Sequence, residues 1–290
     1  MPGRTPCVVK SANRVRWGTK QPYAIFDRPR VICSGSFYFC FKAGSRGGAS
    51  MERIDGRRAD ELRKWSIVPN FLSHPAGSAL ISCGGTRVVC AVSSENRVPS
   101  WMKSQGKTGG WITCEYGMLP ASTHDRMKRE ASSGKQGGRT VEIQRLIGRS
   151  LRMCADLEKM GENTFFVDCD VIDADGGTRC GGISGAAAAL AMACRRLYPE
   201  ASPFKQLVAA VSVGIIDGTP VLDLCYEEDS RAEVDMNVVM AESGEFIEIQ
   251  GTAEHGTFSR NRMNELLDLA EHGLRQIFQL QRECIEAGLK

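Results

Sequence analysis

The amino-acid sequence predicts a mixed α+β fold over residues 51–290, in which strands alternate with helices. Three observations support this prediction. Two apolar runs rich in β-branched residues, Ser78–Cys83 and Arg87–Ser93, flank a Gly-Gly-Thr turn, which is typical of a β-hairpin. Apolar residues recur at helical spacing across Thr140–Leu157, and again across Arg260–Ala287. Both of these segments are therefore expected to form amphipathic helices.

The remaining elements follow from the same rules. Short apolar runs bounded by turn residues predict strands, and a run of small apolar residues predicts a buried helix. The expected strands are Trp111–Tyr116, Thr164–Ile172, Leu207–Ile216, Val221–Tyr226, Met236–Met240 and Phe246–Ile249, and the expected buried helix is Gly185–Leu197. Pro99–Gly110 is rich in proline, glycine and polar residues, so we expect a loop there.

Composition excludes several classes of protein. A hydrophobic content of 42% and a charged content of 24% are those of a globular chain. No apolar run reaches the length of about 18 residues that a membrane span needs, so we expect no membrane segment. The 12 cysteines include no Cys-x-x-Cys pair, and many lie inside apolar runs. We interpret them as small buried side chains in a reducing compartment, and expect neither a disulfide framework nor a zinc site.

Residues 1–50 differ from the rest of the chain in charge. They carry nine lysines and arginines and one acid, Asp27, whereas residues 51–290 carry 28 basic and 33 acidic residues. We expect the functional protein to begin near Met51. A flexible extension, a targeting segment and a wrongly assigned start are all open as interpretations of residues 1–50. We expect a cytoplasmic protein, with organellar targeting by this segment left open.

A glycine-rich segment, Gly134–Thr140 (Gly-Lys-Gln-Gly-Gly-Arg-Thr), lies directly before a predicted helix. Glycines let backbone N–H groups approach an anion, and the N-terminus of a helix favours negative charge. Arg139 would add a guanidinium group that can bind two phosphate oxygens at once. The segment predicts one wall of a phosphate site, and a simple surface loop before a helix is the alternative.

A second segment, Asp173–Arg179 (Asp-Ala-Asp-Gly-Gly-Thr-Arg), repeats this pattern between a strand and the buried helix. Gly177, Thr178 and Arg179 supply a glycine, a hydroxyl and a guanidinium at the start of the helix. Two such elements predict two walls of one phosphate pocket. The spacing is not that of a P-loop, because no Gly-Lys-Ser/Thr follows. A turn with a capping threonine is the alternative.

An acidic run, Glu227–Asp235, lies between the predicted strands Val221–Tyr226 and Met236–Met240. Asp229 and Asp235 lie six residues apart, and in an extended segment this even spacing would place both on one face. Two such carboxylates beside a phosphate pocket can hold Mg²⁺ or handle a proton. The alternative is a solvated acidic loop.

A basic cluster, Arg126, Lys128 and Arg129, could bind along a nucleic-acid backbone, or could be an ordinary charged surface.

Together these segments closely resemble the ribonuclease PH family from about Met51 to the C-terminus. The likeness rests on many short matches in order. They are WITCEYGMLP (111–120), GKQGGRT (134–140), EIQRLIGR (142–149), DCDVIDADGGTR (168–179), AAVSVGI (209–215), EDS (228–230), DMNVVM (235–240) and QGTAE (250–254).

The resemblance implies an α+β domain of two βαβα-like halves that assembles into a hexameric ring, a trimer of dimers. It implies a tRNA nucleotidyltransferase, in which inorganic phosphate releases nucleoside 5′-diphosphates from the 3′ ends of tRNA precursors and related RNA. By this resemblance Arg139, Gly177, Thr178 and Arg179 bind phosphate. Asp229 and Asp235 serve catalysis and Mg²⁺ binding, and Arg126 and Arg129 contact RNA. Whether an aspartate donates a proton or only binds the metal stays open.

The sequence departs from the family pattern at two places. Ala121 replaces a usual arginine after Leu-Pro, which puts the strength of tRNA binding in doubt. Residues 180–182 are Cys-Gly-Gly in place of larger or hydroxyl-bearing residues, so we expect a looser helix start. Two other interpretations are weighed against the enzyme. One is an inactive ring subunit like those of exosomes, and the other is a relative of polynucleotide phosphorylase, which joins two such domains.

Overall fold

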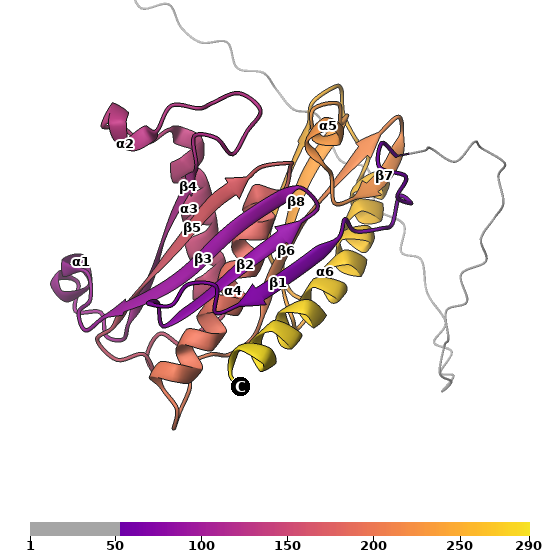
Figure 1. Cartoon of the computed structure of the whole chain (residues 1–290). Helices are drawn as coiled ribbons and strands as arrows, with labels where there is room; N and C mark the ends of the chain where they lie inside the picture. The colour runs from indigo at the N-terminus through magenta and orange to yellow at the C-terminus, as the bar shows by residue number, and fades with distance from the viewer. Residues whose placement is uncertain (1–52) are drawn as a thin grey trace, which may run out of the picture. The chain divides into compact units, whose positions relative to one another are not determined.

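The computed structural model describes residues 53–290, so the predictions for residues 1–50 and for a start near Met51 lie outside the described residues. Figure 1 shows two β-sheets and the helices that pack between and beside them. The predicted α+β class is therefore confirmed.

The first sheet contains five strands in the order β1-β2-β3-β5-β4. Their bounds are β1 (Trp65–Pro69), β2 (Gly77–Cys83), β3 (Thr86–Glu95), β4 (Trp111–Met118) and β5 (Thr164–Asp173). The expected hairpin forms between β2 and β3, and all neighbouring strands are antiparallel except β4 and β5. A parallel pair needs a crossover connection, which here contains α2 (Glu130–Ser133) and α3 (Gly138–Arg152). The segment expected to be a loop before β4 holds a short helix, α1 (Ser100–Ser104).

The second sheet contains four antiparallel strands in the order β7-β6-β8-β9. Their bounds are β6 (Val208–Ile216), β7 (Thr219–Leu222), β8 (Val234–Ala241) and β9 (Phe246–Ala253). A one-turn helix, α5 (Tyr226–Asp229), separates the two hairpins, and α6 (Arg260–Gly288) follows the second one. Each half of the fold is therefore one sheet followed by one long helix, α4 after the first sheet and α6 after the second, which fits the predicted division into two α/β halves.

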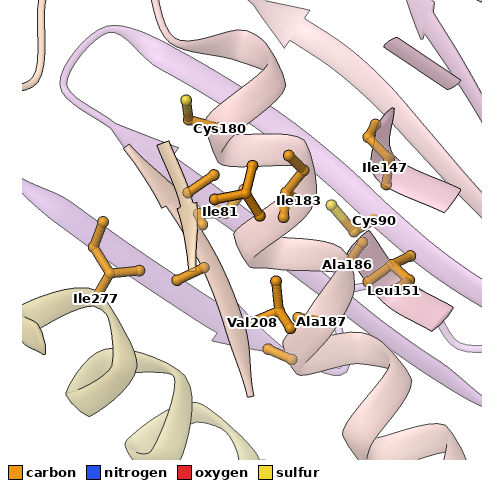
Figure 2. Close-up of a cluster of buried hydrophobic side chains, with 14 of the residues drawn as sticks. Ile81, Cys90, Ile147, Leu151, Cys180, Ile183, Ala186, Ala187, Val208 and Ile277 are labelled. Carbon is orange, nitrogen blue, oxygen red and sulfur yellow. The ribbon is translucent and has the colours of Figure 1, made fainter. Parts of the chain in front are cut away.

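Helix α4 (Thr178–Leu197) lies between the two sheets and forms the centre of the core. It packs against β2, β3 and β5 on one side and against β6 on the other, and α6 packs beside it against β1 and β6. Every residue from Cys180 to Cys194 is buried. Figure 2 shows side chains from both sheets and both helices meeting in this core, with Ile81, Cys90, Ile183, Ala186, Val208 and Ile277 among those labelled.

Small side chains allow α4 to approach the first sheet closely. A Cβ atom on Gly185 would lie 2.8 Å from Cγ2 of Ile81 and 2.9 Å from Sγ of Cys90. A Cβ on Gly181 would lie 3.1 Å from Sγ of Cys83. The expected looser helix start is therefore wrong, because the glycines at this end of α4 are closely packed. The helix also begins seven residues before the predicted Gly185, because a run of glycine and serine hides its periodicity from a sequence pattern.

All nine cysteines of the described part of the chain are buried free thiols, as predicted. In particular, Cys90 and Cys169 lie directly opposite each other on β3 and β5 and line the core beneath α4. Among residues 53–290, no helix combines the length and the apolar character that crossing a membrane requires.

We predict that Gly185→Ala lowers the free energy of unfolding by about 1–3 kcal/mol, because the added methyl group would overpack the contact between α4 and β2–β3. Denaturant unfolding at a fixed protein concentration measures the change. Gly138→Ala is the control, since a Cβ there meets no atom within 4 Å. Equal stability of the two variants would contradict this account of the packing.

Candidate active site

The predicted phosphate pocket is a cavity of about 390 Å³ at the start of α4. Arg139 reaches it from the first turn of α3, and Gly177, Thr178 and Arg179 from the start of α4. Asp229 and Asp235 line the same cavity from α5 and β8. The structure thus brings together all six residues that the sequence suggested for phosphate binding and catalysis.

The N-terminus of α4 supplies backbone donors to this cavity. Gly176 and Gly177 have φ angles of +72° and +67°, which glycine adopts without strain. The first i→i−4 hydrogen bond of the helix joins the N–H of Gly181 to the carbonyl oxygen of Gly177. The N–H groups of the three residues before Gly181 therefore precede the helical ladder, and this end of a helix favours an anion.

The loop before α4 is tied closely to α5. A Cβ atom on Gly176 would lie 2.8 Å from the carbonyl carbon of Cys225, so only glycine fits at this crossing. Oδ1 of Asp175 accepts a hydrogen bond of 3.2 Å from the N–H of Tyr226, the first residue of α5. These contacts place the N-terminus of α4 next to the helix that carries Asp229.

Arg63 connects the loop before α4 to the second sheet. Its guanidinium donates to the carbonyl oxygen of Asp175 and, at 2.7 Å, to Oδ1 of Asp223, which follows β7. The other carboxylate oxygen of Asp223 accepts from the backbone N–H of Arg63 at 2.9 Å and from Nε1 of Trp65 at 2.8 Å. Both members of the ion pair are buried.

A second buried ion pair holds α5. Nε and Nη2 of Arg53 donate to the two carboxylate oxygens of Glu228 at 2.7 and 2.6 Å. Glu228 precedes Asp229 directly, so the pair sets the position of the catalytic candidate. The acidic run thus contains one anchor with a structural role and two acids that line the cavity.

The expectation that Asp229 and Asp235 share an extended segment is wrong. Asp229 is the last residue of α5, and Asp235 is the second residue of β8. The chain between them turns, with the N–H of Ala232 donating to the carbonyl oxygen of Asp229 at 3.3 Å. A helix end followed by a turn, and not the two-residue period of a strand, brings the two carboxylates to one cavity.

Asp235 is held in an unfavourable environment for a carboxylate. Burial and, after it, the nearby charge of Asp229 together raise its pKa to about 6, although the charge of Arg179 opposes the rise. A carboxyl group with such a pKa can bind a cation when ionised or donate a proton when neutral.

One further contact orients a hydroxyl on the phosphate side of the cavity. The phenol of Tyr116 donates a hydrogen bond of 2.9 Å to Oγ1 of Thr178. Burial raises the pKa of Tyr116, so this donor keeps its proton at neutral pH. The hydroxyl hydrogen of Thr178 is then left to be donated elsewhere. Arg139 is exposed, and its side chain makes no hydrogen bond or ion pair within residues 53–290.

A second cavity of about 480 Å³ adjoins the first and shares Met118, Met127 and Arg139 with it. It is lined in part by Lys128, Lys135 and Arg129, and the last of these is one of the two arginines proposed for RNA contact. Arg126, the other one, is exposed and lines neither cavity.

Oxygen donors of the first cavity suit Mg²⁺. This ion binds through one or two carboxylates together with water and substrate phosphates. Asp229 and Asp235 provide two carboxylates, and no group of three or more potential ligands occurs within residues 53–290. The pair therefore fits an ion that is completed by substrate and water.

Family comparison decides the relationship of the chain. A model described as "3′ exoribonuclease family, domain 1" matches residues 61–195, and one described as "3′ exoribonuclease family, domain 2" matches residues 206–273. The chain belongs to this family. The first match ends within α4 and the second begins before β6, so the two family domains coincide with the two halves of the fold. The resemblance to ribonuclease PH is thereby confirmed.

Solved structures share the fold of this exoribonuclease-family chain. A chain of the Archaeoglobus fulgidus exosome, described as having RNA bound to the active site, is 24% identical with a TM-score of 0.67, and the match covers 78% of this chain and 91% of that one. Rice (Oryza sativa) Rrp46 is 23% identical with a TM-score of 0.63, covering 82% and 100%. A chain of an archaeal exosome core is 24% identical with a TM-score of 0.63, covering 79% and 91%.

Sequence reasoning missed several residues of the site. Asn237, Ser212 and Tyr226 line the cavity, and Gln250 and Glu142 contact Arg179. Four of these five lie within the segments that resemble the family, and Tyr226 directly precedes the acidic run, but none carries a motif of its own. Their roles depend on which strands become neighbours.

We predict that Asp235→Asn stabilises the metal-free protein at pH 7–8. The folded-state pKa of about 6 exceeds the value of 3.8 for a free aspartate, so the ionised carboxylate destabilises the fold above about pH 6. Allowing for solvent screening, the gain is about 1–2 kcal/mol. It should shrink as the pH falls from 6 towards 4, where both states become protonated. Thermal unfolding in EDTA across this range is the measurement, and a gain that grows towards pH 4 would contradict the assignment.

Proposed function

We propose that this protein is a phosphate-dependent 3′→5′ exoribonuclease. It would trim the 3′ ends of tRNA precursors, and also of rRNA and other RNAs, and release nucleoside 5′-diphosphates in a reversible nucleotidyl transfer. The observation that carries the proposal is the meeting of two arginines, a helix N-terminus and two carboxylates in one cavity. Membership of the 3′ exoribonuclease family supports it.

The reaction must bring two anions together. An oxygen of inorganic phosphate attacks the phosphorus of the terminal phosphodiester, and the bond to the 3′ oxygen of the preceding nucleotide breaks. Two unit charges 4 Å apart repel by about 4 kcal/mol at an effective dielectric constant near 20. Arg139, Arg179 and the N–H groups at the start of α4 would offset this repulsion. We assign phosphate binding to these groups together with Gly177 and Thr178.

The leaving 3′ oxygen develops negative charge and takes up a proton. Asp229 and Asp235 would hold Mg²⁺, which when bound stabilises such charge. The raised pKa of Asp235 also suits a proton donor. Both roles use the same carboxylate in different protonation states. We place the RNA strand along the second cavity, where Arg129 lies, with Arg126 as a further contact outside it.

An RNA with a 3′ extension, such as a tRNA precursor, provides the test. We predict shortening only when phosphate and Mg²⁺ are both supplied. Arg139→Ala and Arg179→Ala should each lower kcat/KM by about 10²–10³-fold, the usual effect of removing one donor to a developing anion. Arg195→Ala, an exposed arginine at the other end of α4, is the matched control and should leave the rate unchanged.

Two outcomes would contradict the proposal. Equal shortening without phosphate would indicate hydrolysis. RNA binding without shortening, unaffected by Arg139→Ala and Asp235→Ala, would favour the inactive ring subunit.

We also propose that the chain forms a homohexameric ring, a trimer of dimers. The body of the chain is acidic, so neighbouring subunits are needed to gather enough basic side chains around an RNA strand. Light scattering should give a mass near six times the 31.7 kDa of one chain. A monomer at working concentration would contradict the ring. We keep the cytoplasm as the proposed location.

A further inference from the structure

Arg179 is held by side chains from two other elements. Its Nη1 donates a hydrogen bond to Oε1 of Gln250 on β9. Nε2 of Gln250 donates to Oε1 of Glu142 on α3 at 2.8 Å. The same oxygen of Glu142 lies 3.7 Å from Nη1 of Arg179. The three side chains therefore form a closed set that joins α4, β9 and α3 at the edge of the cavity.

The amide of Gln250 can make both contacts in one orientation only. A guanidinium group donates and never accepts, and a carboxylate accepts and never donates. Oε1 of Gln250 must therefore face Arg179, and Nε2 must face Glu142. Arg179 and Glu142 thus require the same orientation of the amide, and Glu142 holds its Nε2 end.

The contacts with Gln250 and Glu142 both use Nη1 of Arg179, so the other nitrogen atoms of its guanidinium remain available as donors. Nε and Nη2 make no hydrogen bond or ion pair within residues 53–290, and the side chain lines the cavity. Glu142 follows Arg139 by three residues on α3. One stretch of α3 therefore provides the first arginine of the cavity and, through Gln250, orients the second.

We propose that Gln250 is a positioning residue for inorganic phosphate. It holds Arg179 in the orientation that presents Nε and Nη2 to the anion, and Glu142 orients the Gln250 amide. A free arginine side chain has many rotamers, and ordering them at the moment of binding weakens affinity. The contact with Gln250 provides that order in advance. This inference rests on the proposed phosphorolytic function and adds the means by which the phosphate site is set.

The test uses the full chain and inorganic phosphate as the probe. Calorimetry without RNA gives the phosphate Kd, and RNA shortening gives KM for phosphate, KM for RNA and kcat. For Gln250→Ala we expect Kd and KM for phosphate to rise about 5–20-fold, with kcat at saturating phosphate and KM for RNA within about twofold of wild type. Glu142→Ala should give a smaller rise in the same direction. Glu142→Gln keeps an acceptor for Nε2 of Gln250 and should bind phosphate nearly as tightly as wild type.

Glu248→Ala is the matched control. Arg149 on α3 forms an ion pair with Glu248 on β9, so this variant breaks another link between the same two elements without touching Arg179. It should leave phosphate binding unchanged. An equal loss in Glu248→Ala would assign the effect to the docking of α3 on β9 and overturn the proposal.

Unchanged phosphate binding in Gln250→Ala, while wild type binds phosphate, would overturn the inference and leave the proposed function intact. Wild type that binds no phosphate would overturn both. If Gln250→Ala does not fold, the comparison of Glu142→Ala with Glu142→Gln decides the matter, because the Glu142 side chain is exposed and glutamine keeps its size and one acceptor oxygen.

Discussion

The buried ion pair of Arg63 and Asp223 is the interaction on which the site depends. Taking two charges out of water costs several kcal/mol per ion unless hydrogen bonds compensate. Here the carboxylate accepts three hydrogen bonds, from the side chain and backbone of Arg63 and from Trp65. Burial alone raises the pKa of Asp223, but the charge of Arg63 and these hydrogen bonds outweigh it and hold the pKa below its usual value. Because Arg63 also binds the carbonyl oxygen of Asp175, this one pair ties the loop before α4 to the second sheet.

The two carboxylates at the cavity lower the stability of the folded state when they are ionised, because burial raises the pKa of each. The carboxylate of Asp235 is half-buried beside that of Asp229, and Arg139 has no partner within the described part of the chain. These groups remain in place because their neighbours are firmly anchored: Glu228 by Arg53, and the start of α4 by the crossing at Gly176. An anchored backbone that carries uncompensated side-chain charge suits the proposed reaction, in which the site would receive a dianion and stabilise charge on a leaving oxygen.

The sequence allowed the prediction of most strands and of both amphipathic helices, since their periodicity is local. The sequence also predicted one cavity for Arg139 and Arg179. Glycines directly before a helix indicate an anion site through local backbone geometry, which can be recognised without knowing the rest of the fold. Three features could not be predicted from sequence patterns. The start of α4 has no apolar period, α5 is a single turn inside an acidic run, and Gln250 reaches Arg179 only because β9 lies next to β8. Contacts between residues about 70 or more positions apart, such as that of Arg179 with Gln250, follow from the fold and not from a motif.

The central claim is that phosphate, and not water, attacks the terminal phosphodiester. Supplying [³²P]phosphate during RNA shortening tests it most directly, because the fate of the label reports which group formed the new bond. The account predicts that the label enters the β-phosphate of the released nucleoside 5′-diphosphates, one label for each nucleotide removed. Release of unlabelled nucleoside monophosphates would contradict it.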